Sequence, residues 1–260
     1  MRIPSAPVAA ILAHPDDIKC VLGVAQRAMS QGCPVTLFLM TRGEGLRSAA
    51  RSGTPPLEMG ALRMEELRRF LAQVDIADLR LIGIPDGSQT LPAMRDDFFR
   101  AQGAPFMDPL LGVDHVFYDD ALQPGLPFFG EALLALLMAQ LAALGPGLVL
   151  THHPKDDHAD HRAVSFFARR TCRRLAREKR LSPLIYAPLV YYRRFVWPPQ
   201  GDYFYSEAIV AQFPGLRAEQ FLLREEEYAR KVAASQIFVP TLSAEYIASN
   251  MKRDEVLWRL

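Results

Sequence analysis

The stretch Ala13-His14-Pro15-Asp16-Asp17 follows directly after the apolar run Val8–Leu12. A short run of β-branched and aliphatic residues that ends in turn-forming residues predicts a buried strand. Residues 17–31 have the length and apolar spacing of a helix, so the stretch lies where a strand passes into a helix. In open α/β folds, the crevice at the carboxyl ends of the strands is where ligands bind.

The side chains of this stretch suit a metal ion. His14 and Asp17 are three residues apart around a turn that begins with Pro15, whose fixed φ limits how the backbone can bend. One imidazole and one carboxylate can therefore reach a common point, while Asp16 points elsewhere. A borderline cation such as zinc accepts both kinds of ligand.

A second polar stretch lies far along the chain, at Thr151-His152-His153-Pro154-Lys155-Asp156-Asp157-His158-Ala159-Asp160-His161. It also follows a short apolar run, Leu148–Leu150, and it precedes a segment with helical character. Two strand ends that each carry His and Asp supply enough ligands for one metal ion, with coordination positions left open.

Together the two motifs, Ala-His-Pro-Asp-Asp at 13–17 and His-x-Asp-His at 158–161, resemble those of the PIG-L/LmbE family of zinc-dependent N-deacetylases, which act mostly on N-acetyl amino sugars. Thr41-Arg42-Gly43-Glu44, after the second predicted strand, and Arg63-x-x-Glu66, in the next helix, also match the family pattern. The resemblance covers roughly residues 5 to 175 in order. Either metal motif alone would be a weak signal, whereas the pair is a strong one.

The resemblance implies that His14, Asp17 and His161 hold one divalent metal ion, zinc or another. Two neutral imidazoles and one carboxylate leave such a site net positive, so the metal keeps the Lewis acidity that lowers the pKa of a bound water toward ~7. We expect His152 and His153 to be structural or pocket residues, although either of them would serve as a ligand in place of His161.

The same resemblance assigns the catalytic residues. Asp16 matches the family's general base, which lies beside a ligand on the same turn. His158 matches the histidine that stabilises the oxyanion or protonates the leaving amine. Asp160 matches the acid that orients this histidine and favours its charged form.

Three further residues are expected to bind substrate. By resemblance, Arg63 binds sugar hydroxyls, which suits the donor fork of a guanidinium. A surface pair between Arg63 and Glu66 fits the helical spacing equally well. Glu44 and Asp86 lie in strand-end loops and are further candidates.

The chain departs from the family pattern at two places. The acid that commonly follows Asp17 is Ile18 here, with Lys19 next, so the outer support of the turn differs. The later Ser-Gln element of the family is matched only by Ser235-Gln236. These departures bear on the identity of the substrate more than on the metal.

Length and pattern predict a single domain over residues 1–260. Strands that alternate with helices predict an α/β fold with a Rossmann-like, mainly parallel sheet and helices on both faces. Residues 83–129, rich in Pro, Gly, Asp and Phe, are expected to form a wall or lid. Beyond the first strand and helix, the expected strands are 35–40, 79–82, 148–150, 184–195 and 207–212, and the expected helices are 57–74, 131–144, 163–179 and 217–235.

Composition restricts the partners. A net charge of +1 argues against nucleic acid, and the basic cluster between Arg169 and Arg180 is expected to be a solvated helix face. The longest apolar run, residues 133–144, is far short of the ~20 residues that a membrane span needs. No signal peptide is evident, and three widely spaced cysteines indicate reduced thiols in a cytoplasmic protein.

The favoured function is a zinc-dependent hydrolase that removes the N-acetyl group from an amino sugar or a glycosylated small molecule. Its partner would be that N-acetylated small molecule, and a homo-oligomer is compatible with the sequence. Two alternatives are a zinc amidase for a longer N-acyl amide and a non-catalytic, metal-containing binding module. Asp16 and His158 favour the enzyme, because a structural site needs neither of them and is closed by four protein ligands.

Overall fold

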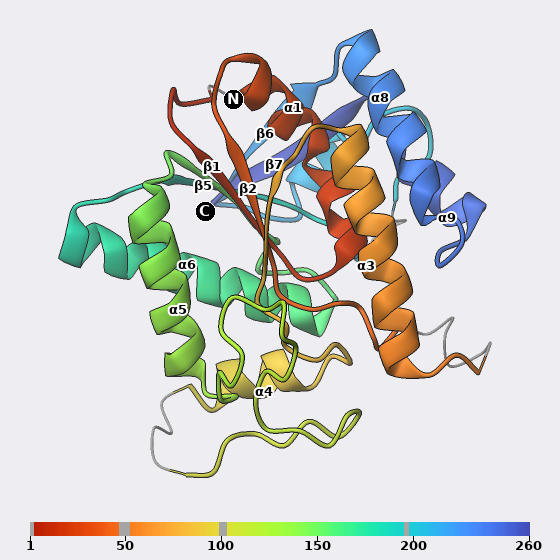
Figure 1. The fold of residues 1–260 in the computed structure, drawn as a ribbon. Helices are drawn as coiled ribbons and strands as arrows, with labels where there is room; N and C mark the ends of the chain where they lie inside the picture. The colour runs from red at the N-terminus through yellow and green to blue at the C-terminus, as the bar shows by residue number, and fades with distance from the viewer. Residues whose placement is uncertain (1–2, 47–52, 99–102, 195–197) are drawn as a thin grey trace.

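The computed structural model describes residues 3–46, 53–98, 103–194 and 198–260. Within these residues seven strands form one sheet, in the order β3-β2-β1-β4-β5-β7-β6 (Figure 1). Neighbours from β3 to β5 pair in parallel, whereas β7 runs antiparallel to both β5 and β6. The strands are β1 Val8–Leu12, β2 Val35–Leu39, β3 Asp78–Leu81, β4 Leu148–Leu150, β5 Leu184–Pro188, β6 Arg217–Leu222 and β7 Asp254–Arg259.

Helices cover both faces of this sheet. α1, α3 and α8 pack on one face, and α4, α5 and α6 pack on the other (Figure 1). The arrangement confirms the predicted fold class, a mainly parallel sheet between two helical layers. The helices are η1 Pro15–Cys20, α1 Leu22–Ser30, α3 Pro56–Gln73, α4 Thr90–Asp96, α5 Gly130–Leu144, α6 Ala159–Lys179, α7 Glu207–Val210, α8 Glu225–Ser235, η2 Gln236–Phe238 and α9 Ala244–Ser249.

The side chains of β1 divide between two cores. Val8, Ala10 and Leu12 pack with the residues of α1 and α3, while Ala9 and Ile11 pack with those of α5 and α6. This division follows from the two-residue period of a strand. A parallel strand that is covered on both faces has an unbroken apolar sequence, and this is why β1 is predictable from sequence.

The winding of the chain changes direction beside β1. From β1 the chain passes outward to β2 and β3, and it then returns to form β4 on the other side of β1. β1 and β4 pair in register, from Val8 with Leu148 to Ala10 with Leu150. The turns that follow these two strands therefore open onto one crevice, which is where folds of this type bind their ligands.

The segment after β1 differs from the helix predicted over residues 17–31. Pro15–Cys20 forms the 3-10 helix η1, and the α-helix α1 begins only at Leu22. The carboxylate of Asp17 accepts a hydrogen bond from the backbone N–H of His14 at 2.8 Å and closes the tight turn. A 3-10 helix has about 3.0 residues per turn, so side chains three residues apart lie on the same side.

The C-terminal part departs most from the prediction. Residues 207–212, expected as a strand, begin with the short helix α7, because Ser206 Oγ caps its N-terminus by accepting a hydrogen bond from Ile209 N–H. Residues 217–235, expected as one helix, divide into β6 and α8. β6 lies at the edge of the sheet with mostly half-exposed residues, so its polar sequence resembles that of a solvated helix. The strand β7 was not predicted.

The described residues of 83–129 are largely irregular, as predicted, and contain the short helix α4. The strand expected over residues 184–195 ends at Pro188. Its expected last residue, 195, lies outside the described residues, as do residues 47–52, between an expected strand and the next expected helix, and residues 99–102 of the expected wall or lid.

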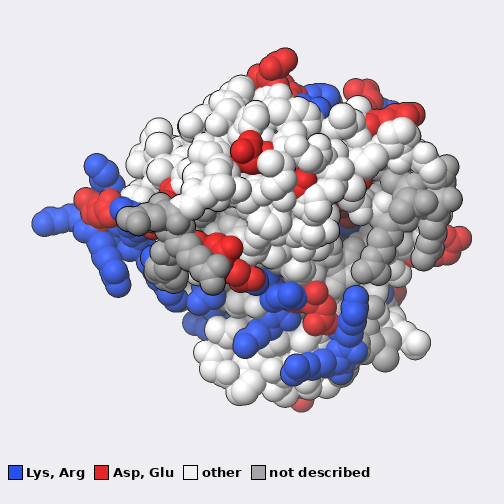
Figure 2. Space-filling model, turned by 90° about the horizontal axis from the view of Figure 1, so that it is seen from below, with Lys and Arg blue, Asp and Glu red and all other residues white. Residues whose placement is uncertain are grey.

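The basic cluster of α6 lies at the surface. Arg173 and Arg177 are exposed, and Arg174 pairs with Glu178 and Glu131. On the face seen in Figure 2, basic side chains stand in separate groups with acidic side chains near them. These contacts support the prediction of a solvated helix face. Across the described residues, no helix has the length and hydropathy to cross a membrane.

Candidate metal centre and active site

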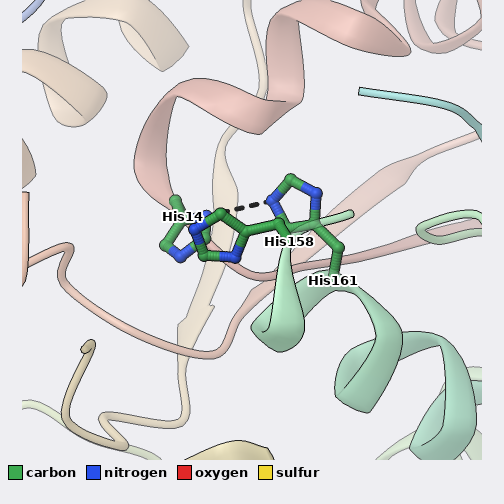
Figure 3. A group of neighbouring side chains, drawn as sticks. All are labelled: His14, His158 and His161. Atoms are coloured by element: carbon green, nitrogen blue, oxygen red, sulfur yellow. Dashed lines mark hydrogen bonds between the residues drawn. The ribbon is translucent and has the colours of Figure 1, made fainter. Parts of the chain in front are cut away.

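Three donor atoms from the two predicted motifs meet in the crevice beyond β1 and β4. His14 Nδ1 lies 3.2 Å from Asp17 Oδ2 and 3.2 Å from His161 Nε2. His161 Nε2 lies 3.4 Å from Asp17 Oδ2. Figure 3 shows the imidazoles of His14, His158 and His161 close together, the first from the turn after β1 and the others from the start of α6. We call the three atoms of His14, Asp17 and His161 the donor triangle.

The donor triangle has the dimensions of a metal site. Ligands at about 2.0–2.1 Å from a tetrahedral zinc ion lie about 3.3 Å apart, close to the three distances of the triangle. Two imidazoles and a carboxylate also form a donor set that suits zinc. Among the described residues, three overlapping groups offer donor atoms within 4.8 Å of one another: His14, His158 and His161; Asp17, His152 and His161; and His14, Asp86 and Asp160.

The local backbone explains why the first motif contributes two of these atoms. His14 and Asp17 are three residues apart at the start of η1, so the 3-10 geometry brings their side chains to one side. An α-helix would turn them about 60° apart. The tight turn that contradicts the predicted helix is thus what brings the imidazole and the carboxylate together.

The two other histidines of the second motif have different contacts. His152 Nε2 accepts a hydrogen bond from Ala13 N–H at 2.9 Å, so its lone pair is already engaged. The ring of His152 stacks on that of His161, with centroids 3.8 Å apart. His153 Nδ1 accepts a hydrogen bond from Lys155 N–H, and its ring packs against the rings of Phe213 and Trp258. Both residues therefore fit a structural role better than the role of a metal ligand in place of His161.

The groups around the donor triangle favour positive charge. Burial by itself would lower the pKa of His14, but Asp86 and Asp17 raise it well above its ordinary value. Burial likewise opposes the charged form of His161, yet Asp17 and Asp156 raise its pKa to about 9. Carboxylates that favour a proton on these two imidazoles also favour a divalent cation in the same place.

Asp156, which the sequence prediction did not single out, lies behind His161. Its Oδ1 lies 3.2 Å from His161 Nδ1, on the side of the ring away from the donor triangle. It also accepts hydrogen bonds from the backbone N–H groups of His158, Val190 and Tyr191, so it links the start of α6 to the segment after β5. Metal-ligating histidines usually donate the N–H of their second ring nitrogen to a carboxylate. This rule could have indicated an Asp of the polar stretch at residues 151–161.

Asp16 is held by two cations. Its Oδ2 accepts from Lys19 Nζ at 2.5 Å, and its Oδ1 accepts from Arg63 Nη2. Burial by itself would raise the pKa of Asp16, but Lys19 and Arg63 hold it below its ordinary value. Asp16 lines the same pocket as His14 and is therefore a charged carboxylate beside the donor triangle.

His158 and Asp160 are placed differently from the predicted pair. His158 lines the pocket, but burial and the charges of His14 and His161 lower its pKa to about 3. Asp160 Oδ2 lies 3.8 Å from His158 Nδ1 and 3.6 Å from His14 Nε2, and it accepts hydrogen bonds from Ser88. The carboxylate is thus shared between two imidazoles, and the pKa of His158 moves down rather than up.

Arg63 is a buried pocket residue and makes no surface pair with Glu66. Only 3% of it is exposed, and its Nη1 donates to Gly43 O at 3.2 Å. Gly43 has a φ of 81°, and a Cβ built there would lie 2.0 Å from Arg63 Nη1, so this approach requires glycine. Glu66 accepts hydrogen bonds from Thr241 instead.

The two remaining predicted substrate residues differ in position. Asp86 lines the pocket, and its Oδ1 lies 3.3 Å from His14 Nε2. Glu44 is buried behind the pocket, where it accepts hydrogen bonds from Tyr118 OH and from the backbone N–H of Asp86. Burial raises the pKa of Glu44 to about 7, although the bond from Tyr118 opposes this. The contacts of Glu44 are those of a support for Asp86.

The pocket above the donor triangle has a volume of about 630 Å³. One of its walls comes from the segment after β5, through Tyr191, Tyr192 and Arg193. The ring of Tyr191 lies against the rings of His158 and His161, with centroids 5.7 and 5.6 Å away. The sequence prediction missed this wall, because no local pattern marks it.

A Rossmann-like sheet with an open His/Asp donor set at its crevice places the chain in the class of α/β proteins that can hold a divalent metal ion in a pocket. More particularly, the chain belongs to the PIG-L family: the family described as GlcNAc-PI de-N-acetylase matches residues 9–172. A search of curated proteins finds no match.

Solved structures share the fold over nearly the whole chain. The antimicrobial pseudoaglycone deacetylase Dbv21 is 18% identical, with a TM-score of 0.60 over 98% of this chain and 97% of that one. The N,N'-diacetylchitobiose deacetylase from Pyrococcus horikoshii is 12% identical, with a TM-score of 0.59 over 98% and 84%. GalB, a 4-carboxy-2-hydroxymuconate hydratase from Pseudomonas putida, is 15% identical, with a TM-score of 0.59 over 98% and 95%. At such identities the likeness shows the fold alone.

Proposed function

We propose that this protein is a metal-dependent hydrolase that removes the N-acetyl group from an amino sugar or a glycosylated small molecule. The observation that carries the proposal is the donor triangle, beside which a charged carboxylate, Asp16, and an imidazole, His158, line one open pocket. Amide hydrolysis needs these groups together: a site that activates water, a base for its proton and a donor for the oxyanion.

We assign His14, Asp17 and His161 as the metal ligands, with zinc as the metal. The spacing of the donor triangle and the engaged lone pair of His152 support this set over the alternatives with His152 or His153. When bound, the metal supplies the Lewis acidity that polarises an amide carbonyl and acidifies a water molecule. Asp156, through His161, and Asp86, through His14, would hold the imidazoles in orientation.

In this proposal Asp16 takes the proton from the attacking water and passes it to the nitrogen of the leaving amine as the amide C–N bond breaks. Lys19 and Arg63 keep it ionised, so it is ready to accept a proton at neutral pH. His158 donates a ring N–H to the oxyanion. Its lowered pKa favours the neutral imidazole, which has one N–H to donate, over the imidazolium expected from sequence.

The family description and the likeness to sugar deacetylases support an N-acetylated sugar as the substrate. The pocket of about 630 Å³ supports a substrate larger than an isolated acetamide. Arg63 and Asp86, which line the pocket, offer donors and acceptors for hydroxyl groups. The hydratase GalB has the same fold, so the reaction must be tested directly.

The test combines metal analysis with amine release. Purified protein should contain one zinc per chain, lose activity with a chelator and regain it when zinc is restored. It should release acetate and a primary amine from N-acetylglucosamine or N,N'-diacetylchitobiose. A preference for the N-octanoyl analogue would identify a longer-acyl amidase. Stoichiometric metal with no release from any of these amides would support a non-catalytic binding module.

A cytoplasmic location belongs to the same proposal. Cys20, Cys33 and Cys172 are free thiols, as expected for a protein of a reducing compartment. Fractionation of cells that express the tagged chain would test it, and recovery of the chain outside the cytoplasmic fraction would contradict it.

A further inference from the structure

Lys19 is a fully buried cation next to the pocket. Only 1% of it is exposed, and its Nζ lies 2.5 Å from Asp16 Oδ2 and 3.0 Å from Asp16 O. Lys19 does not line the pocket, whereas Asp16 does. Its contacts are therefore with the carboxylate and not with a bound substrate.

The 3-10 helix η1 explains this placement. Asp16 and Lys19 are three residues apart, so they share one side of η1, just as His14 and Asp17 share another. This turn thus supplies two atoms of the donor triangle, from His14 and Asp17. Beside them it holds the carboxylate of Asp16 together with its cation, Lys19. Lys19, which holds Asp16, directly follows Ile18, the residue that stands where the family pattern commonly has an acid.

The other surroundings of Lys19 hold its ammonium in place. Nζ lies 5.2 Å from the centroid of the Tyr246 ring, at a distance suited to a cation–π contact. Tyr246 OH in turn bonds to Tyr191 OH at 2.7 Å, so α9 packs over Lys19 and against the pocket wall. The second oxygen of Asp16 is held from the opposite element, α3, by Arg63.

A second buried lysine shows what a purely structural pair looks like in this protein. Lys231 is also 1% exposed, and its Nζ bonds to Glu255 Oε1 at 2.8 Å. Glu255 uses its carboxylate to accept from the N–H groups of Gly23 and Val24 at the start of α1. Neither Lys231 nor Glu255 lines the pocket, so this pair is a matched control for Lys19.

We propose that Lys19 is a positioning residue, which fixes the carboxylate of Asp16 in one orientation beside the donor triangle. The inference rests on the proposed function, in which Asp16 is the base. A carboxylate held through one oxygen can rotate about its side-chain bonds, whereas Lys19 and Arg63 hold both oxygens and Lys19 also holds the carbonyl. A displacement of a catalytic group by about 1 Å lowers a rate by about 10²-fold.

The first experiment compares K19M with K231M. K19M should keep its metal, lower kcat by about 10²-fold and leave KM within about twofold of its original value. K231M should lower the melting temperature by at least as much as K19M, because each substitution leaves a buried carboxylate without its lysine partner. Its kcat should remain unchanged at temperatures where it is folded. A K19M variant with unchanged kcat, or one that loses its metal with its activity, would overturn the proposal.

The second experiment asks whether Lys19 acts through Asp16. If it does, K19M should lower kcat less than about threefold in a D16N background, although it lowers kcat about 10²-fold in the original chain. Equal fold losses in the two backgrounds would overturn the proposal.

The pairing can also be measured without any reaction. In urea unfolding, the shift in midpoint caused by K19M should be at least halved in the D16N background. Equal shifts would overturn the proposal even if the chain hydrolyses no N-acetyl substrate. Inactivity of the unchanged protein toward all the amides would count against the proposed function alone, so the two failures are distinguishable.

Discussion

The two parts of the chain that meet at the pocket contribute different things. Residues 9–172, the part matched by the family, carry the donor triangle, Asp16 and His158. The later part supplies none of these groups, but Tyr191 and Leu242 line the pocket above them. The difference leads us to expect that the first part determines the reaction and the later part the choice of substrate.

The two parts share one apolar core, in which Phe238 packs against Phe70. Around the site they are also joined by polar contacts, in which Thr241 donates to Glu66 and Tyr246 OH meets Tyr191 OH. Substitutions in the donor triangle or at Asp16 should change metal content or kcat, and substitutions of pocket residues in the later part should change KM.

The largest effect is expected from H161A. Loss of one atom of the donor triangle should remove most of the bound metal and, with it, the activity. Elemental analysis of the purified variant measures this. H153A is the control, because His153 is equally buried but packs away from the triangle, and it should keep its metal. Stoichiometric zinc in H161A would move the ligand role to another donor, such as His158.

D16N should have the next largest effect. Its amide cannot accept the proton of the attacking water, so kcat should fall by ~10²-fold or more, while the metal stays bound. Steady-state kinetics with metal analysis measure both quantities. If D16N loses its metal together with its activity, Asp16 is a metal ligand, and its assignment as a base separate from the donor triangle is wrong.

Y191A tests the later part of the chain. Removal of the ring should raise KM for a sugar substrate by about 10-fold and leave kcat within about twofold, because an aromatic contact contributes about 1 kcal/mol to binding. Tyr203, which is 46% exposed and does not line the pocket, provides the control variant Y203A. If kcat falls instead of KM rising, the division between the two parts is wrong.

The smallest effect on activity, but a measurable one on stability, is expected from E44Q. The pKa of Glu44 is raised from 4.5 to about 7 by burial, so the folded state binds its proton more tightly than the unfolded state does. This contribution to stability is fully present below about pH 4.5 and is lost as the pH rises through about 7, a change of up to about 3 kcal/mol.

The uncharged amide of E44Q lacks this pH dependence. Urea unfolding at pH 5 and pH 8 should therefore show E44Q gaining stability relative to the unchanged protein at the higher pH. If the difference in stability between E44Q and the unchanged protein is the same at both pH values, the pKa of Glu44 is not raised in the folded state. In that case the ionisation of Glu44 would not contribute to the pH dependence of stability.

Several elements were predictable because their causes are local. The apolar periodicity of residues 57–74 predicted α3 to within a residue or two, and the short apolar run Leu148–Leu150 predicted β4. β6 and α7 were mispredicted, because an edge strand exposes polar residues and a single Ser cap can nucleate a short helix. In both cases the position in the sheet or the cap outweighed residue propensity.

The chemical groups of the site could be recognised from local sequence patterns. The two His/Asp motifs each follow a recognisable strand, and within the first motif the atoms of His14 and Asp17 meet across only three residues. Short-range geometry of this kind is limited by the few backbone conformations available to a turn that begins with proline. The family resemblance rests on these same local motifs.

Which of these groups come into contact depends on how the distant segments pack. His14 and His161 are 147 residues apart, and the parallel pairing of β1 with β4 brings them together. The carboxylate of Asp156 behind His161 and the ring of Tyr191 above it depend on how β5 and α6 pack. Contacts between distant residues follow from the packing of the whole sheet, which no local pattern encodes. The donor triangle could therefore be proposed from its two motifs, whereas the choice of Asp156 among several acids, and the position of Tyr191, could not.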